Sequence, residues 1–315
     1  MREIGGYFEM EKANGSLYHE GALALNSGRH CLEYIIRERH IKKLYIPEFM
    51  CYTATETCKK CQCEYEYYPI QKNFLPDLKD KIEREQYIYI VNYYGQISNK
   101  VLDELVNEYR NVIIDNVQAY FQKPLNGVDT IYSCRKFLGI ADGGFLYTTI
   151  KSNMKLEKDF SSDRIHFVLG RFEQGATIFF EEASRNNDFF SDEPVKLMSA
   201  LTENMLKSFD YQEIMQKREN NFETLNRYLG EINELNVVNP IGPFMYPLCI
   251  KNGAELRKKL IQKKIYIPYL WGDVFRMAKR DSVAWYYAEN ILPLPCDQRY
   301  GEVEMKYIVE NVKKR

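Results

Sequence analysis

The sequence predicts an α/β protein in which a mostly parallel sheet is sandwiched by helices and is followed by a smaller C-terminal α/β unit. Two observations lead to this prediction. From residue 44 onward, short apolar runs that are typical of buried strands alternate with stretches of helical periodicity. The chain also has 315 residues, of which 45% are hydrophobic, so it can bury a large core and divide into more than one domain.

The elements of the first part follow one another in β-α-β order. Strand-like runs occupy residues 44–47, 63–70, 87–93, 112–117 and 129–133, and residues 144–148 are expected to return antiparallel. Helices are expected at residues 52–60, from Pro76 to about Glu83, and around 101–109, where the apolar residues recur at helical spacing. Repeated β-α-β units run neighbouring strands in parallel and place helices on both faces of the sheet.

In the second part of the chain, the regular alternation of strands and helices gives way to mainly helical segments. Residues 151–206 are mainly helical and irregular in pattern, and a long amphipathic helix is expected over 211–229. After it come two predicted strands, at 244–250 and 264–268, and two predicted helices, at 254–262 and 302–312. We therefore divide the chain into a large domain of residues 1–206 and a small domain of residues 207–315.

Charge and hydropathy argue against several classes of function. The 43 basic and 44 acidic residues nearly cancel, so no overall field attracts nucleic acid or an anionic membrane. No apolar run approaches the roughly 18 residues that span a bilayer, and the N-terminus lacks the basic-then-apolar pattern of a signal peptide. We therefore expect a cytoplasmic protein with neither a nucleic acid nor a membrane as its partner.

The eight cysteines raise the question of a metal site. Cys58, Cys61 and Cys63 form a C-x-x-C-x-C cluster, with Cys51 upstream, and this spacing is close to that of zinc ligands. A structural zinc site uses four ligands, usually in two separated pairs, and this stretch offers neither a histidine nor a second C-x-x-C. We expect no metal and interpret the cysteines as reduced thiols that are buried or half-buried.

Two side chains near predicted strand ends have the chemistry that pyridoxal 5'-phosphate requires. Asp115 ends the run 112–115, and Lys136 follows the run 129–133. A lysine can bind the aldehyde of this cofactor as a Schiff base, and an aspartate can keep its pyridine nitrogen protonated. Ligands of parallel sheets bind beyond the carboxyl ends of the strands, so both residues are expected at one site. Taken alone, Lys136 would be an ordinary solvated lysine.

A third segment is a candidate for binding the phosphate of the cofactor. Ser27, Gly28 and Arg29 precede an apolar helix, and small or hydroxyl residues at a helix N-terminus form an anion site from N–H groups and the helix dipole. Serine is also a common N-cap, so an ordinary capped helix is the alternative. With Lys136 and Asp115 nearby, phosphate binding is favoured, and Ser133 could add a hydroxyl from the other side.

With these residues the chain resembles the DegT/StrS-type nucleotide-sugar aminotransferases, which are fold-type-I pyridoxal phosphate enzymes. The resemblance extends from about residue 4 to the C-terminus. It rests on Asn26-Ser-Gly28, Tyr94-Gly-Gln96, Asp115-Asn-Val-Gln118, Ser133-Cys-Arg-Lys136 and Asp142-Gly-Gly144 in this order. It is closest to a shorter, divergent branch with Ile4-Gly-Gly-Tyr-Phe-Glu9 at its start and Asp297-Gln-Arg-Tyr-Gly301 near its end.

The resemblance implies an aspartate-aminotransferase-like large domain and a reaction. The enzyme would move an amino group from an amino acid, expected to be glutamate, to a keto-sugar nucleotide. Lys136 would carry the cofactor and act as the base, and Asp115 would pair with the pyridine nitrogen. Gln118 would lie near the ring hydroxyl. The phosphate would be held by Ser27, Gly28 and Ser133. A homodimer with its site at the subunit interface is implied as well.

The chain departs from the family pattern at three places. Ile131 stands where the S-F-H-x-x-K pattern has its serine. Cys51 stands where an aromatic residue often stacks on the cofactor ring. Residues 195–199 stand where an Asn-x-Arg-Met segment reaches toward the neighbouring subunit.

Two other functions remain open from the sequence. The first keeps the cofactor but changes the reaction to that of a lyase or a sugar dehydratase; Lys136 argues against the dehydratase, which usually has histidine there. The second is a non-catalytic sensor or assembly protein on the same fold. Four arginines are candidates for binding a diphosphate or a donor carboxylate, with surface ion pairs as the alternative for each: Arg29, Arg135, Arg171 and Arg299.

Overall fold

A seven-stranded sheet forms the centre of the molecule in the computed structural model, which describes residues 4–79 and 82–314. Its order is β1-β7-β6-β5-β4-β2-β3, and all pairs from β6 to β3 are parallel, whereas β7 is antiparallel to both neighbours. The strands are β1 (Leu23–Leu25), β2 (Lys43–Pro47), β3 (Glu64–Tyr68), β4 (Tyr87–Val91), β5 (Val112–Asp115), β6 (Asp129–Ser133) and β7 (Gly144–Tyr147). The predicted mostly parallel sheet, with an antiparallel return near residue 144, is confirmed.

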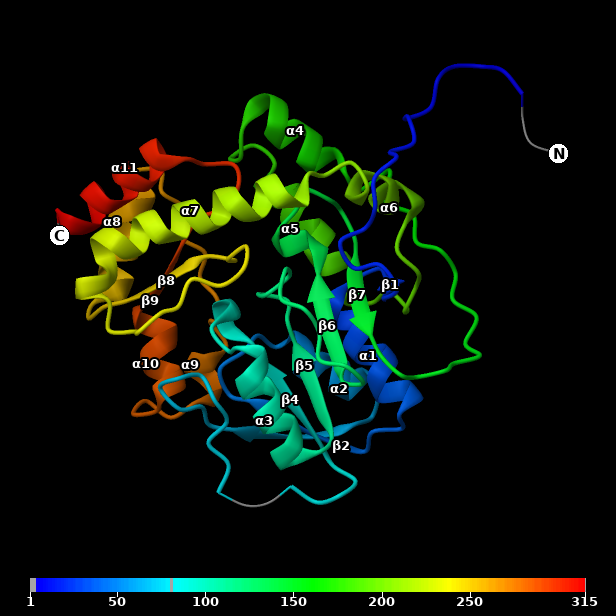
Figure 1. Cartoon of the computed structure of the whole chain (residues 1–315), viewed down its shortest axis with the longest axis horizontal. Coiled ribbons are helices and arrows are strands. Elements are labelled where there is room, and N and C mark those ends of the chain that lie inside the picture. The colour runs from blue at the N-terminus through cyan, green and yellow to red at the C-terminus, as the bar shows by residue number, and fades with distance from the viewer. Residues whose placement is uncertain (1–3, 80–81, 315) are drawn as a thin grey trace.

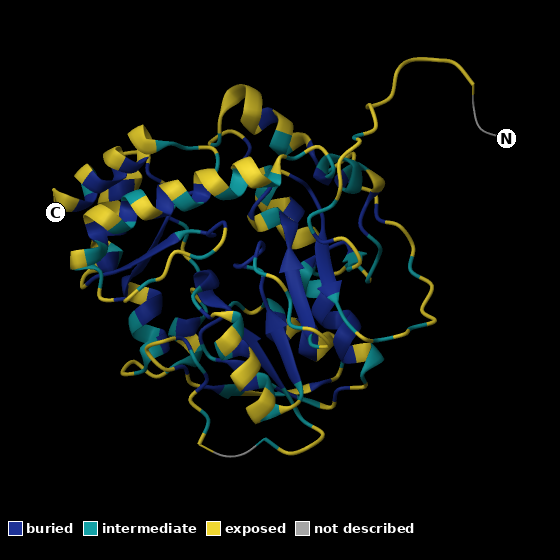
Figure 2. Cartoon of the chain, in the orientation of Figure 1, coloured by how far each residue is buried: buried dark blue, intermediate teal, exposed yellow. Residues whose placement is uncertain are grey.

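Three helices connect the parallel strands and cover both faces of the sheet (Figure 1). α1 (Gly28–Glu38) and α2 (Thr53–Lys60) lie on one face, and α3 (Asn99–Tyr109) lies on the other. β5 and β6 are buried along their whole length, as Figure 2 shows in dark blue. Strands that are covered on both faces consist of continuous apolar runs, and such runs can be recognised in the sequence.

A helical segment leads from the sheet to the C-terminal part. It contains α4 (His166–Gln174), α5 (Phe180–Phe189), α6 (Ala200–Leu206) and α7 (Tyr211–Leu229). α7 is the long helix predicted over 211–229, and Asp210 caps it by accepting a hydrogen bond from the N–H of Glu213. In Figure 1 it extends from the sheet toward the C-terminal helices.

The C-terminal part builds a second, smaller core. Its elements are the antiparallel pair β8 (Tyr246–Cys249) and β9 (Ile291–Leu294), with α8 (Gly253–Gln262), α9 (Val274–Met277), α10 (Val283–Asn290) and α11 (Glu302–Lys313). Phe222 of α7, Leu248 of β8 and Met305 of α11 belong to this core. Other residues of the same part, such as Tyr287, pack into the main core. A domain boundary after residue 206, which falls between α6 and α7, therefore stays a prediction.

The second strand of the small unit was predicted at the wrong place. Residues 264–268 form no strand, although Ile265 and Ile267 are both buried in the second core. The two isoleucines are buried by packing, without hydrogen bonds to a neighbouring strand. Lys264, at the start of the segment, has a φ of 60°, which lies outside the range of a β-strand. The partner of β8 is instead β9, which contains Pro293 and for which no strand was predicted.

The short helix predicted from Pro76 to about Glu83 was also wrong. Residues 76–79 and 82–83 are not helical, and residues 80 and 81 lie outside the described residues. Pro76 instead forms an isolated antiparallel bridge with Ile70, which turns the chain back toward the end of β3. Nowhere in residues 4–79 and 82–314 is a helix both long enough and apolar enough to cross a membrane.

Candidate active site

Asp115 lies at the carboxyl end of β5, between β4 and β6, and its side chain is buried. Its Oδ1 accepts a hydrogen bond from the N–H of Val117 (2.8 Å), and its Oδ2 accepts one from the hydroxyl of Tyr89 (2.7 Å). Burial raises the pKa of the Asp115 carboxyl, while the two hydrogen bonds and the charge of Lys136 oppose this rise. The carboxyl is thus a desolvated group whose charged form is favoured by three neighbours.

Lys136 ends η2 (Cys134–Lys136), a short 3-10 helix that continues β6 directly beyond Ser133. Its side chain is exposed, and its Nζ lies 5.6 Å from the ring centroid of Phe244. Its charge acts on Asp115, so the structure brings the two predicted residues into one electrostatic environment. The sequence prediction placed both at strand ends, and both are found there.

The backbone that follows Lys136 is fixed from the C-terminal part. The carbonyl oxygen of Phe137 accepts hydrogen bonds from Nη2 of Arg218 (3.0 Å) and Nε2 of Gln298 (2.9 Å). Arg218 is only 2% exposed and also donates to Gln298 Oε1 (2.7 Å). Gln298 belongs to the Asp297–Gly301 stretch, which had no chemical interpretation at the level of sequence. Its contact supplies one: the stretch holds the segment that carries the lysine.

Ser27 caps the N-terminus of α1. Its Oγ accepts a hydrogen bond from the N–H of His30 (3.3 Å). The first N–H groups of a helix have no acceptor within it, so those of Gly28 and Arg29 must be satisfied from outside the helix. Gly28 faces the side chain of Ser133, since a Cβ at Gly28 would lie 3.6 Å from the Cβ of Ser133. The structure therefore brings Ser27, Gly28 and Ser133 together.

β7 approaches this helix end very closely. A Cβ at Gly144 would lie 2.6 Å from the carbonyl carbon of Ser27 and 2.7 Å from the nitrogen of Gly28. Only glycine fits such an approach, which gives a physical reason for the Asp142-Gly-Gly144 motif. Asp142 adds to the rigidity here because its carboxylate accepts hydrogen bonds from the N–H and the hydroxyl of Ser199 (both 2.8 Å).

The side chains of Gln118 and Arg29 form hydrogen bonds with different parts of the chain. Gln118 is buried, and its Oε1 accepts a hydrogen bond from the N–H of Tyr94 (2.8 Å), which has a φ of 54°. The guanidinium of Arg29 turns to Ser191, to whose Oγ it donates (2.6 Å), at the wall of a pocket of about 350 Å³. The guanidinium of Arg29 is thus engaged by Ser191, while its backbone N–H remains at the N-terminus of α1.

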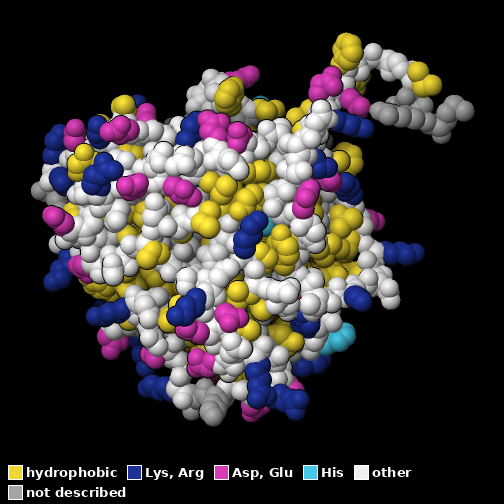
Figure 3. Space-filling view, viewed as in Figure 1, with side chains coloured by type: hydrophobic (Ala, Val, Ile, Leu, Met, Phe, Trp, Pro, Cys, Tyr) yellow, Lys and Arg dark blue, Asp and Glu magenta, His cyan; other side chains and the backbone are white. Residues whose placement is uncertain are grey.

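The other three candidate arginines are dispersed. Arg135 stacks on Phe190, with 4.6 Å between the guanidinium carbon and the ring centroid. Arg299 forms a bidentate ion pair with Asp297, in which Nε donates to Oδ1 over 2.7 Å and Nη2 donates to Oδ2 over 2.9 Å. Arg171 lies exposed on α4. The structure does not gather these side chains into one anion-binding cluster, and on the face shown in Figure 3 the Lys and Arg side chains are scattered among Asp and Glu.

Three residues of this region were missed at the level of sequence: Tyr89, Arg218 and Gln298. Tyr89 stands in a run of apolar strand residues, and only the pairing of β4 with β5 reveals that it reaches Asp115. Cys51, which takes the place of the stacking aromatic residue, is half-buried and lies within electrostatic reach of Tyr89 and Tyr93.

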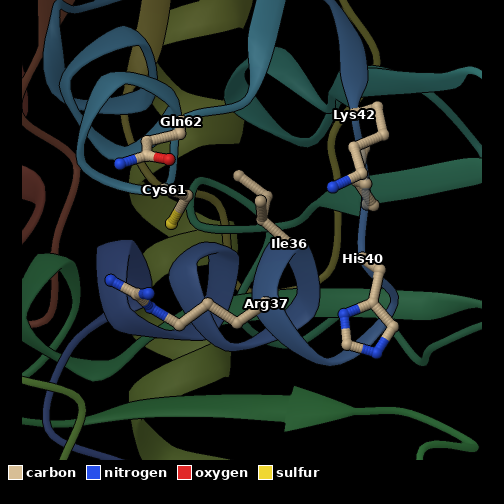
Figure 4. A pocket seen from close by; sticks show the side chains of 7 residues that line it. Ile36, Arg37, His40, Lys42, Cys61 and Gln62 are labelled. Carbon is tan, nitrogen blue, oxygen red and sulfur yellow. The ribbon is translucent and has the colours of Figure 1, made fainter.

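A second pocket, of about 290 Å³, lies outside the site (Figure 4). Arg37, His40 and Lys42 line it beside the C-terminal end of α1 and the start of β2, at the edge of the sheet opposite Asp115. Cations at a helix C-terminus offset its negative end, which is a structural role. All eight cysteines are free thiols, and among the described residues no three His, Cys, Asp or Glu side chains gather around a possible metal position.

The fold is shared with sugar aminotransferases of known structure. CalS13, a sugar aminotransferase from Micromonospora echinospora, matches with a TM-score of 0.64 at 14% identity, over 93% of this chain and 87% of that protein. A DegT/DnrJ/EryC1/StrS aminotransferase from Brucella abortus matches with a TM-score of 0.61 at 14% identity, over 94% and 86%. NtdA from Bacillus subtilis, solved with the bound cofactor PMP, matches with a TM-score of 0.63 at 13% identity, over 93% and 72%.

No protein-family model matches the chain, and no curated protein sequence matches it. At 13–14% identity the likeness establishes the fold. The chain therefore has the fold of the DegT/StrS-type aminotransferases, which confirms the architecture that the sequence motifs implied.

Proposed function

We propose that the protein is a pyridoxal phosphate-dependent aminotransferase that moves an amino group from an amino acid, with glutamate as the expected donor, to a keto-sugar nucleotide. The observation that carries the proposal is the combination of Lys136 with a buried, doubly hydrogen-bonded Asp115 at the carboxyl edge of a parallel sheet. The fold shared with sugar aminotransferases supports the reaction, and the PMP bound in NtdA supports the cofactor.

The residues present fit this cofactor at both of its ends. A carboxylate has about four lone-pair positions, so Asp115 can accept a further hydrogen bond from a pyridine nitrogen. The N-terminus of α1 offers N–H groups and a favourable dipole to a phosphate, with the hydroxyl of Ser133 beside it. Gln118 adds a buried amide from the loop that follows Asp115.

When bound, pyridoxal phosphate would supply an electron sink for the transfer of the amino group. Lys136 would bind the cofactor and, after release by the donor amine, would carry a proton at Nζ between the two reacting carbons. Asp115 would hold the proton of the ring nitrogen. Because Arg218 and Gln298 fix the carbonyl of Phe137, the backbone of the lysine stays in place through both tasks.

We also infer that the protein is a homodimer. Large apolar side chains are exposed on α4, on α5 and on the segments beside them: Phe160 (80%), Phe172 (93%), Ile178 (65%) and Phe180 (72%). An exposed apolar patch of this kind marks an interaction surface. It is continuous with the site, because Arg135 donates to Asn187 of α5. The eight free thiols suit the reducing cytoplasm, where we infer that the protein is located.

The absorption spectrum of the purified protein with added pyridoxal phosphate tests the proposal. We expect a visible band in the wild type that glutamate shifts and that Lys136→Ala lacks, because only a lysine-bound cofactor produces it. Lys151→Ala, which removes an exposed lysine, is the control. A wild type without the band would contradict the proposal. A band that no amino donor shifts would favour the lyase alternative.

A further inference from the structure

Tyr89 reaches Asp115 from the neighbouring strand. In the parallel pairing of β4 with β5, Tyr89 lies opposite Ile113, and Val91 lies opposite Asp115. Tyr89 and Val91 share a face of the sheet because side chains alternate along a strand. The ring of Tyr89 therefore extends along the strand toward the carboxylate, and its hydroxyl donates to Oδ2 over 2.7 Å.

The two hydrogen bonds to Asp115 differ in what they require. The bond from the N–H of Val117 comes from two residues further along the chain, and an aspartate at the end of a strand often makes such a bond. The bond from Tyr89 spans 26 residues and needs a tyrosine at one register position of β4. The bond from Tyr89 is therefore the one that an aspartate at a strand end does not ordinarily make.

A phenol suits this position because it donates without bringing a charge. Burial, followed by the charge of Asp115, raises the pKa of Tyr89 well above its ordinary value, so the hydroxyl keeps its proton. The other titratable groups that interact with Asp115 are Lys136 of η2, Cys31 of α1 and Tyr93 of η1 (Tyr93–Gly95). Burial raises the pKa of both Cys31 and Tyr93, so these two are neutral. Among these groups, only Lys136 brings a positive charge, and Tyr89 adds a direct hydrogen bond.

A second buried tyrosine, Tyr68, makes a hydrogen bond nearby that does not involve the carboxylate of Asp115. Tyr89 is 4% exposed, and its backbone carbonyl accepts a hydrogen bond from the hydroxyl of Tyr68 in β3 (2.7 Å). Tyr68 thus makes the same kind of bond, from a buried phenol to an oxygen, but to the backbone of Tyr89 rather than to the carboxylate. The pair offers a matched comparison.

We propose that Tyr89 is a positioning residue of the active site, whose phenol keeps the carboxylate of Asp115 charged and fixed so that it can hold the proton of the cofactor's ring nitrogen. This inference deepens the proposed function and rests on it. It predicts that the hydroxyl of Tyr89 affects cofactor binding and the titration of Asp115, and that loss of a neighbouring hydroxyl does not.

The experiment compares Tyr89→Phe with Tyr68→Phe in the full chain. The first readout is the affinity of the cofactor-free protein for pyridoxal phosphate. Because a hydrogen bond to a charged group is stronger than one between neutral groups, Tyr89→Phe should weaken binding by about tenfold or more. Tyr68→Phe should bind as the wild type does, although it loses a buried hydrogen bond. Urea unfolding of both variants checks that each is folded.

The second readout needs no cofactor. Carbon-13 spectra of protein labelled at the aspartate carboxyl, assigned with Asp115→Asn, follow the protonation of this one group. Because the phenol stabilises the carboxylate, Asp115 should titrate at higher pH in Tyr89→Phe than in the wild type and in Tyr68→Phe.

The outcomes separate the inference from the proposed function. If the wild type binds pyridoxal phosphate and the two variants lose affinity equally, the bond is merely structural and the inference is overturned. An unchanged titration of Asp115 in Tyr89→Phe overturns it as well. If the wild type binds no pyridoxal phosphate at all, the proposed function fails first and the inference falls with it.

Discussion

The guanidinium of Arg218 donates a 3.0 Å hydrogen bond to the carbonyl oxygen of Phe137, 81 residues away in the sequence. The same guanidinium donates to the carbonyl of Pro243 (2.8 Å). A buried cation normally pairs with a carboxylate, yet the acceptors of these bonds are carbonyl oxygens. Arg218 therefore acts as a multiple donor that joins α7, the loop before β8 and the lysine segment.

Removal of this donor should destabilise the fold. Arg218→Met keeps the aliphatic part of the side chain but leaves the carbonyl of Pro243 without its donor and the carbonyl of Phe137 with Gln298 alone, so the free energy of unfolding should fall by about 2–4 kcal/mol. Arg227→Met, on the exposed face of the same helix, should change it by less than about 0.5 kcal/mol. Urea denaturation measures both. Equal losses would mean that the contacts of Arg218 contribute little.

Gly144→Ala should disrupt the phosphate end of the site. The new methyl group would lie 2.6–2.8 Å from backbone atoms of Ser27 and Gly28, so β7 and α1 must move apart, at a cost of about 1–3 kcal/mol. We expect a lower melting temperature and a clear loss of affinity for pyridoxal phosphate. Gly301→Ala is the control, since its nearest contact would be at 3.8 Å. Unchanged affinity in Gly144→Ala would argue against a phosphate at this helix end.

Acid should destabilise the protein through a buried histidine. Burial lowers the pKa of His19 to about 3 from the ordinary 6.5. Between these values the unfolded chain binds more protons than the folded one, so stability falls as the pH falls through this window. At pH 5 this histidine alone should cost about 2 kcal/mol relative to neutral pH. His19→Gln should make the pH dependence of unfolding shallower, whereas His166→Gln, at an exposed site, serves as the control. An equal slope in His19→Gln and the wild type would refute this account.

A charge in the apolar patch should prevent the proposed association. Phe172→Asp places a carboxylate at a side chain that is 93% exposed in the single chain and that would be buried in a dimer. Sedimentation velocity should therefore detect monomers of Phe172→Asp at concentrations where the wild type is dimeric. Val303→Asp, at an exposed position on α11, should leave the dimer intact. If Val303→Asp dissociates the dimer instead, the interface lies elsewhere.

The sequence located the ends of β5 and β6, because strands covered on both faces need long apolar runs. Asp115 and Lys136 stand out against such runs, and the rule that ligands bind beyond strand ends assembled them into one site. The same reasoning could not predict the contact of Tyr89 with Asp115. A tyrosine fits an apolar strand, and its contact with Asp115 depends on a register that no single strand specifies.

The small unit was harder to predict because its sheet has two strands, and both of them are edge strands. Pro247 lies opposite Pro293 in the pair of β8 and β9, at a position where neither residue offers an N–H. Each of the two strands contains a proline, and no strand was predicted at residues 291–294. The segment 264–268 had the expected alternation, but its isoleucines pack without strand pairing. Periodicity reports which side chains are buried and does not report which backbones pair.

The two hydrogen bonds on the carbonyl of Phe137 also tie the segment that carries Lys136 to the C-terminal part of the chain. Arg218 lies on the helix that supplies Phe222 to the smaller core, and Asn221 beside it donates to the carbonyl of Tyr300 (2.9 Å). A local opening of the smaller core would therefore release Lys136 while the seven-stranded sheet stays folded. Lys136 would then move without unfolding of the sheet, and amide exchange at Phe137, whose N–H donates to the carbonyl of Cys134, would measure how often this opening occurs.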